Sequence, residues 1–237
     1  MQQSNTYTLL FTAIVTIILG FMLSLAATSL KERQELNITI DIKKNILRSL
    51  GFSESDDEPW TQNNIQDIFE RNIKSFVVDS GGSKVPGVSV DNIVQTDQYP
   101  VYCSHISEGV IDGYAIPISG KGLWSTLYGY IALEADGITV KGITFYKHGE
   151  TPGLGGEVEK EWFTSNFVGK RIVDNNGKLV SIEIIKGEVD ELSPEAYHQV
   201  DGISGATMTS KGLNAFLKTD LEKYEPFFQR IRKERTN

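Results

Sequence analysis

The chain has 237 residues, of which 40% are hydrophobic and 23% are charged, and its formal net charge is −8. This composition excludes a disordered chain and a bundle of membrane spans, and the length allows one substantial domain or a domain and a half. The acidic balance and the lack of a Lys/Arg cluster argue against nucleic-acid binding, because phosphate contacts need clustered cations. The single cysteine, Cys103, rules out an intrachain disulfide and any zinc or iron–sulfur site built from several cysteines of this chain.

The N-terminal segment 7–27, YTLLFTAIVTIILGFMLSLAA, contains no charged residue. At about 1.5 Å per residue, a helix of this length crosses a hydrocarbon core of about 30 Å, so the segment predicts a transmembrane anchor within residues 1–30. A cleavable signal peptide is the alternative, but its apolar region is usually shorter and follows Lys or Arg, and neither precedes residue 7. Lys31 and Arg33 follow the segment, and the positive-inside rule alone would place the large domain in the cytoplasm.

Two helices are predicted after the anchor. The first has apolar residues at helical spacing and then a glycine that can cap its C-terminus: Leu36, Ile40, Leu47, Leu50 and Gly51. Thr61 precedes the second, whose apolar stripe is Ile65, Ile68, Phe69, Ile73 and Phe76. Residues 31–98 are therefore expected to form a helical, membrane-proximal region that packs on the domain after it.

From Tyr99 onward the apolar pattern has a period of two. It predicts strands at 101–106 and 110–118, a hairpin over 127–146 with a type I′ turn at Asp136-Gly137, and a strand at 178–187. Short helices are expected at 161–169 and at 193–200, the second with Ser193 as its N-cap. Residues 99–237 are thus predicted to form an α+β domain with a mixed, largely antiparallel sheet and flanking helices.

The common catalytic sets find little support in this sequence. Three histidines, His105, His148 and His198, are far apart, and no HExxH, GxSxG or Walker pattern occurs. A glycine-rich segment, HGETPGLGGE at 148–157, is more informative. Glycines let backbone amides approach a planar or anionic ligand closely, although a plain loop remains the alternative.

A second segment, DGISGATMTSKGL at 201–213, holds three glycines and four hydroxyl residues. Thr209 or Ser210 can cap a helix that continues through Leu213 and Phe216. Backbone N–H groups at a helix start favour an anion, so a phosphate near Thr207 would lie in a suitable field. On spacing alone, a capped turn without a ligand is the simpler interpretation.

The same segment resembles the flavinylation motif of the FMN-binding domain family. In that motif an Asp is followed three residues later by Ser/Thr-Gly-Ala-Thr, and the last Thr carries FMN through a phosphoester. The segments GKGLWSTLYGYIALE, GITFYKHGETPGLGGEVE and FVGK, in this order after an N-terminal anchor, resemble the C subunits of Na+-translocating NADH:quinone oxidoreductases. The G subunits of Rnf-type ferredoxin:NAD oxidoreductases are the alternative within the family, but their loop usually continues with Asp-Lys where this chain has Gly156-Glu157.

The resemblance assigns residues to an FMN site. Thr207 would be the covalent attachment point, and Asp201 would be the acidic position read by a flavin transferase. The turn around the phosphate would be shaped by Ser204, Gly205 and Ala206. Residues implied to line the flavin are Glu150, Thr151, Gly153, Leu154 and Gly155, with Trp124 and Ser125 in a second family motif. After Glu157 the chain departs from the family, since VEKEW replaces a polar-Asn-Pro turn. No catalytic residue beyond the cofactor and no metal are expected.

The resemblance also implies a role. The chain would be a single-pass electron-transfer subunit of a six-subunit complex in the bacterial inner membrane, with its FMN domain in the periplasm, against the charge signal. Electrons from NADH would pass through FAD and an iron–sulfur centre of another subunit to this FMN, then to an FMN-bearing membrane subunit and ubiquinone, with sodium transport by the complex. Expected partners are those subunits, the flavin transferase during maturation, and membrane lipid. A non-covalent nucleotide- or anion-binding module, and a scaffold whose flavin site has lapsed, are the alternatives.

Overall fold

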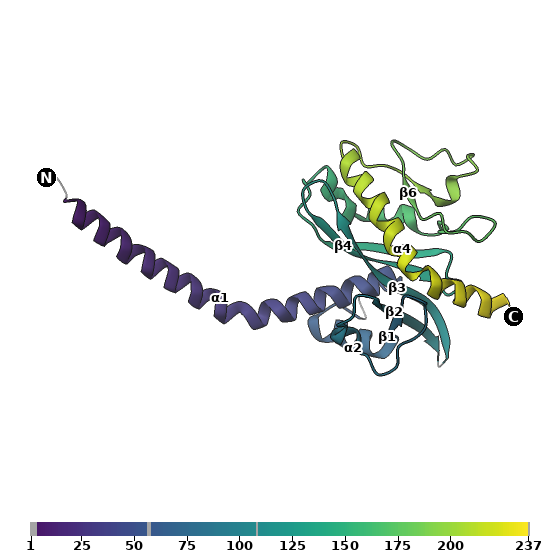
Figure 1. The fold of residues 1–237 in the computed structure, drawn as a ribbon, viewed down its shortest axis with the longest axis horizontal. Helices are drawn as coiled ribbons and strands as arrows, with labels where there is room; N and C mark the ends of the chain where they lie inside the picture. Colours follow the sequence, from purple (N-terminus) through teal and green to yellow (C-terminus); the bar gives the residue numbers. More distant parts are fainter. Residues whose placement is uncertain (1–3, 56–57, 108, 237) are drawn as a thin grey trace. The chain divides into compact units, whose positions relative to one another are not determined.

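A computed structural model describes residues 4–55, 58–107 and 109–236 of the chain (Figure 1). The chain divides into two compact units, one ending at Asp41 and the other beginning at Ile42. Helix α1, Asn5–Ser49, starts in the first unit and ends in the second, and it joins the predicted anchor and the helix expected after it. It is long and apolar enough to cross a membrane, which is consistent with a single anchor. The three-part division expected from the sequence stays a prediction.

The second unit is built on a five-stranded antiparallel sheet whose strands follow chain order, β1-β2-β3-β4-β5. Its strands are β1 (Ile73–Asp79), β2 (Gln98–Ser107), β3 (Val110–Lys121), β4 (Thr126–Glu134) and β5 (Val140–Lys147). The strands expected at 101–106 and 110–118 and the hairpin strands are confirmed. Hairpins connect each consecutive pair of strands from β2 to β5. The same end of the sheet therefore holds the end of β3, the start of β4 and the end of β5.

The segment after α1 differs from the prediction. Gly51 has a φ of 86° and Phe52 N donates to Leu47 O, which confirms the predicted C-cap. Thr61 caps α2 (Gln62–Asn72), since its side chain accepts from Asn64 N. The helix then ends, and Ile73 and Phe76 lie in β1 instead of a helical stripe. The β-branched run in IKSFVVD explains this, because Val77 and Val78 are fully buried in strand positions.

Three local predictions in the second half were wrong in detail. The β4–β5 turn is not type I′, because only Gly137 of the pair has a positive φ and the Asp136 carboxylate accepts from Ile138 N and Thr139 N. The strand expected at 178–187 shrinks to β6 (Glu183–Ile184), which pairs in parallel with β7 (Gln199–Val200). Ser193 accepts from Glu195 N, but the short 3-10 helix η4 (Ala196–His198) begins one residue later, so Ser193 is not its N-cap.

The remaining helices complete the second unit. The predicted helix at 161–169 appears as α3 (Glu161–Thr164) and the 3-10 turn η3 (Ser165–Phe167). Two more 3-10 turns are η1 (Val90–Asn92) and η2 (Gly155–Glu159). The last element is α4, Thr207–Thr236, which carries the apolar stripe predicted from Leu213 to Leu221.

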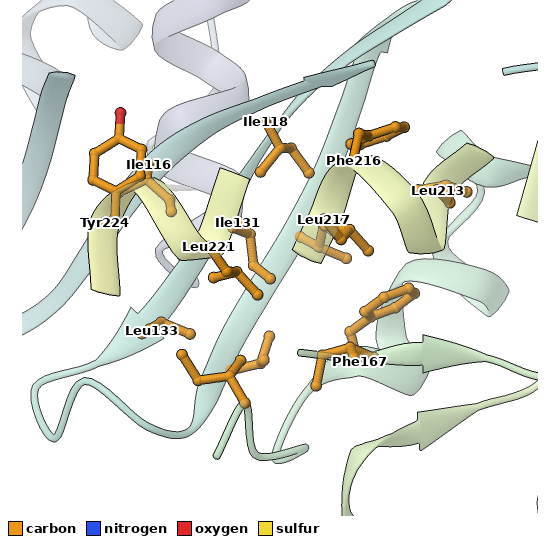
Figure 2. Close-up of a cluster of buried hydrophobic side chains, with 14 of the residues drawn as sticks. Ile116, Ile118, Ile131, Leu133, Phe167, Leu213, Phe216, Leu217, Leu221 and Tyr224 are labelled. Atoms are coloured by element: carbon orange, nitrogen blue, oxygen red, sulfur yellow. The ribbon is translucent and has the colours of Figure 1, made fainter. Parts of the chain in front are cut away.

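Helix α4 packs on one face of the sheet and forms the main core with β3 and β4 (Figure 2). Its buried side chains meet those of the two strands in one cluster: Leu213, Phe216, Leu217, Leu221, Tyr224, Ile116, Ile118, Ile131 and Leu133. The contact is very close at two glycines. A Cβ at Gly120 would lie 2.2 Å from Phe216 Cβ, and one at Gly212 would lie 2.2 Å from Lys121 O. The N-terminal half of α4 is therefore held against the end of β3.

Candidate functional site

The DGISGAT segment forms a tight turn that leads directly into α4. Gly205 has a φ of 73°, and Ala206 N donates to Ile203 O at 3.1 Å. Ile203 and Ala206 are buried, whereas Ser204 and Thr207 are exposed. Thr207 is the first residue of a 30-residue helix. Its hydroxyl is thus accessible at a helix start, where free N–H groups and the helix dipole favour an anion.

The predicted role of Thr209 and Ser210 as helix caps was wrong. The helix begins at Thr207, so both residues lie inside its first turn and are buried, at 1% and 8% exposure. Thr209 Oγ1 donates to Glu150 Oε2 at 2.7 Å instead of capping the helix. Thr209 and Ser210 are therefore both buried, whereas Thr207 is exposed.

The turn is fixed to the segment 184–189 by backbone and side-chain hydrogen bonds. Asp201 Oδ1 accepts from Val189 N at 2.7 Å, and Gly202 N donates to Gly187 O at 2.9 Å. Farther along α4, the amide of Asn214 both accepts from Ile184 N and donates to Ile184 O. Segment 184–189 therefore runs beside the motif and the first turns of α4. In this arrangement Asp201 holds the turn in place.

A cavity of about 750 Å³ lies beside Thr207. Its walls come from Trp162, from residues 183–188, and from the motif and α4: Asp201, Gly202, Ile203, Ser204, Gly205, Thr207, Ser210, Lys211 and Asn214. This volume is within the range of about 300–1,000 Å³ that is usual for cofactor and small-ligand sites. The structure thus brings four of the implied site residues, Asp201, Ser204, Gly205 and Thr207, to one cavity.

Several residues of this cavity were not found from the sequence. Lys211 and Asn214 follow Thr207 by four and seven positions in a helix, so helical spacing from the motif was a usable signal. Trp162 and Lys186 had no such signal. Trp162 lies on α3 and Lys186 follows β6, and it is the tertiary fold that brings both to the cavity, which no local pattern predicts.

The ETPGLG loop is joined to the GKGLWS loop and to α4 through Glu150. This side chain is only 5% exposed. Its Oε1 accepts from Trp124 N at 2.9 Å and Ser125 N at 3.1 Å, and its Oε2 accepts from Leu123 N at 3.2 Å and from Thr209 Oγ1. The side chain of Ser125 accepts from Gly149 N at 2.6 Å. The two family loops therefore form one hydrogen-bonded unit.

Most of the other implied residues lie in these loops and do not line the cavity. They are Glu150, Thr151, Gly153, Leu154, Gly155, Trp124 and Ser125, while Ala206 is buried under the turn. The ETPGLG loop contacts the DGISGAT segment through Leu154, because a Cβ at Gly205 would lie 2.6 Å from Leu154 Cδ2. The proximity of the loops to the motif is thus observed, and their contact with a flavin stays a prediction.

The electrostatics of Glu150 follow from its surroundings. Burial alone would raise the pKa of its carboxyl, but the hydrogen bond from Thr209 and those from the backbone amides of Trp124, Ser125 and Leu123 outweigh burial and lower the pKa. The group is therefore an ionised carboxylate at neutral pH, adjacent to the first turn of α4.

Large apolar side chains near the motif are exposed. Trp124 is 70% exposed and Met208 is 54% exposed, and Leu123, Leu154 and Trp162 are each more than 40% exposed. Side chains of this kind are suited to cover a planar ring. Together with the cavity and the helix start, they can accommodate a ligand that has an anionic group at one end and an aromatic ring at the other.

Comparisons with known proteins agree with this geometry. Residues 122–222 match the family model of the FMN-binding domain, and this range contains every implied site residue. A relative from Pseudomonas aeruginosa, the C subunit of Na(+)-translocating NADH-quinone reductase, is 36% identical, with 98% of each chain covered. The C subunit of the same enzyme from Vibrio anguillarum is 32% identical, with 87% of this chain and 86% of the relative covered.

Solved structures give the same result. A crystal structure of the C subunit of Na(+)-translocating NADH-quinone reductase from Parabacteroides distasonis matches with a TM-score of 0.71 and 33% identity, covering 84% of this chain and 96% of that one. The crystal structure of Shewanella oneidensis NqrC matches with a TM-score of 0.68 and 27% identity, covering 86% and 99%. The chain belongs to the NqrC family, the C subunits of the Na+-translocating NADH-quinone reductase, and it contains that family's FMN-binding domain.

Proposed function

We propose that this chain is a membrane-anchored electron-transfer subunit that carries FMN on Thr207 through a phosphoester. The observation that carries the proposal is an exposed hydroxyl at the first position of a 30-residue helix, on the wall of a cavity of about 750 Å³. FMN has a phosphate at one end and a planar ring at the other. The helix start suits the phosphate, and the cavity with its apolar rim suits the ring.

Charged residues of both signs line the cavity, and two of them are lysines suited to an anionic ligand. Lys186 and Lys211 both line the cavity and are exposed. Glu150 is buried behind the first turn of α4, where Thr209 and three backbone amides satisfy it. Glu183, Glu188 and Asp201 also line the cavity, and the Asp201 carboxylate accepts from Val189 N. The preference for an anion beside Thr207 therefore rests on the helix start and the two lysines, and not on the net charge of the cavity walls.

When bound, the flavin supplies the one- and two-electron chemistry of the relay. The residues of this chain supply attachment and position. Gly120 and Gly212 hold α4 tightly on β3, so a group attached to Thr207 starts from a rigid point. A covalent bond also prevents loss of the cofactor between turnovers. We therefore place this FMN between the NADH/iron–sulfur subunit and the FMN-bearing membrane subunit, on the route to ubiquinone.

We further propose that α1 crosses the bacterial inner membrane once and that the FMN domain is periplasmic. The apolar segment of α1 supports the anchor. The side rests on the family resemblance, in which the flavin transferase acts outside the cytoplasm. Protease added to intact spheroplasts should digest the domain, and a domain that stays protected until the cells are lysed would contradict this topology.

The attachment is tested with the full chain coexpressed with its flavin transferase. On a denaturing gel, the wild-type band should fluoresce under ultraviolet light and Thr207→Ala should be dark. Thr219→Ala is the matched control, since Thr219 is an exposed threonine farther along the same helix. Mass spectrometry of the tryptic peptide 187–211 should show the mass of FMN less one water, on Thr207. A fluorescent Thr207→Ala band, or an unmodified wild-type peptide, would refute the proposal.

A further inference from the structure

We propose that Glu150 is a positioning residue, whose carboxylate fixes the first turn of α4 through Thr209 and thereby fixes the Thr207 hydroxyl for modification. The modification itself rests on the function proposed above. The role given to Glu150 does not come from the motif, in which this residue is part of a loop beside the flavin. It comes from the burial of the side chain and from the groups that bind it.

Four donors converge on the two oxygens of Glu150. Three are consecutive backbone amides, those of Leu123, Trp124 and Ser125, at 2.9–3.2 Å, and the fourth is Thr209 Oγ1 at 2.7 Å. Consecutive amides that point into one concavity form a nest for an anion. Among the described residues, no Lys or Arg forms a salt bridge with Glu150. The buried charge therefore depends on these neutral donors, and losing one of them leaves it poorly satisfied.

Two glycines leave room for this carboxylate and for nothing larger. A Cβ at Gly122 would lie 2.7 Å from Glu150 Oε1. A Cβ at Gly155 would lie 2.8 Å from Glu150 Oε2 and 2.5 Å from Thr209 Oγ1. Real Cβ contacts do not come this close, so the backbone of both loops is shaped around the carboxylate. At Gly155 the two nearest atoms belong to Thr209 and Glu150, whereas at Gly122 Leu127 Cδ1 lies nearer still, at 2.3 Å, so Gly155 is the stronger indication.

The link to Thr207 is the first turn of α4. Thr209 is the third residue of the helix, and Ser210 N donates to Ala206 O at 2.9 Å, which closes the turn that contains Thr207. Helix ends fray readily, because their terminal N–H groups lack partners within the helix. The charged hydrogen bond from Thr209 to Glu150 holds this end closed, so that the Thr207 hydroxyl keeps one direction. The lowered pKa of Glu150 agrees with this, since it keeps the acceptor ionised at neutral pH.

The test compares two substitutions at Thr209 in the full chain. Thr209→Val removes the hydroxyl and keeps the shape, whereas Thr209→Ser keeps the hydroxyl. Thr219→Val, at an exposed threonine of the same helix, is the control. Hydrogen exchange in detergent follows the amides of 207–213 and 122–125, with β4 as the measure of overall folding. The rate of FMN attachment at Thr207 is followed with purified flavin transferase.

In Thr209→Val, exchange in 207–213 should rise about tenfold or more and attachment should slow by a similar factor, while β4 exchanges as in the wild type. Thr209→Ser should stay close to the wild type in both. The proposal is overturned if Val and Ser are equally impaired, if neither changes, or if exchange rises while attachment keeps its rate. If the wild-type chain takes up no FMN at Thr207, the proposed function fails. The role of Glu150 is then judged by hydrogen exchange alone. Unchanged exchange in Thr209→Val would show that Glu150 does not hold the first turn of α4.

Discussion

Substituting Gly155 with alanine is the sharpest single test of how the loops and α4 fit together. Gly155 is buried and does not have a positive φ, so its backbone suits any residue. The added Cβ, however, would lie 2.5 Å from Thr209 Oγ1 and 2.8 Å from Glu150 Oε2. Neither neighbour is free to move aside, because Thr209 is 1% exposed and Glu150 is 5% exposed. The methyl group must therefore push the two side chains apart.

The cost follows from what is lost. A hydrogen bond to a charged group is worth about 1.5–3 kcal/mol, and overpacking a closed site costs about 1–3 kcal/mol. We expect Gly155→Ala to lower the free energy of unfolding by about 3–5 kcal/mol. Gly153→Ala in the same loop is the matched control. Gly153 has a φ of 76° and its Cβ would meet nothing within 4 Å. Gly153→Ala should lower the free energy of unfolding only by the cost of placing alanine in a left-handed backbone conformation, about 1–2 kcal/mol.

The assay is urea unfolding of the full chain in detergent micelles, followed by tryptophan fluorescence. The midpoint of Gly155→Ala should lie about 1–2 M below that of the wild type, and Gly153→Ala should lie between them. If Gly155→Ala is no less stable than Gly153→Ala, the close contact between the loop and Thr209 does not exist in solution.

Two further outcomes are expected from the same assay. Phe216→Ala should lower the free energy of unfolding by about 3–5 kcal/mol, because it removes the ring that packs against Gly120. Phe216→Leu should lower it by about 1.5 kcal/mol. Equal losses would show that this contact is not tightly packed. The folded state lowers the pKa of Glu150, so its carboxylate stabilises the fold fully above its ordinary value of 4.5, and the stabilisation is lost as pH falls through the lowered pKa. The stability difference between wild type and Glu150→Gln should therefore be constant at neutral pH and shrink as the pH falls below 4.5, and a difference that stays constant in acid would contradict this.

The parts of the fold that the sequence predicted well are those governed by local periodicity. The period-two pattern identified β2 to β5, and the stripe from Leu213 to Leu221 identified the buried face of α4. The errors occur where tertiary packing overrides local spacing. Ile73 and Phe76 fit a helical stripe, but pairing of β1 with β2 places them in a strand. Ser181 has a φ of 69°, just before β6, where the expected long strand is reduced to two residues.

The site was predictable to a different degree. The motif identified Thr207, Ser204, Gly205 and Asp201, and the structure brings these four to one cavity. The caps were misplaced because hydroxyl spacing cannot tell whether Thr209 bonds to its own helix or to Glu150, which is 59 positions away. Trp162 and Lys186 could not be predicted, since Trp162 lies on the short helix α3 and Lys186 follows the paired strand β6, and only the tertiary fold brings them to the cavity.

The topology explains why the ETPGLG loop and the DGISGAT segment, about fifty residues apart in the sequence, lie close together. In a meander of hairpins, two loops must lie at the same end of the sheet: the loop between β3 and β4 and the loop after β5. The pairing of Tyr128 with Lys147 at this end shows it. The close contact of Gly212 with Lys121 brings the start of α4 to that end of the sheet. Glu150 lies three residues after the end of β5. At this position its carboxylate reaches both the amides of the β3–β4 loop and Thr209. The position of Thr207 is thus determined by the packing of the core, and a change in the Phe216–Gly120 contact should alter the proposed attachment at Thr207 as well as the stability of the fold.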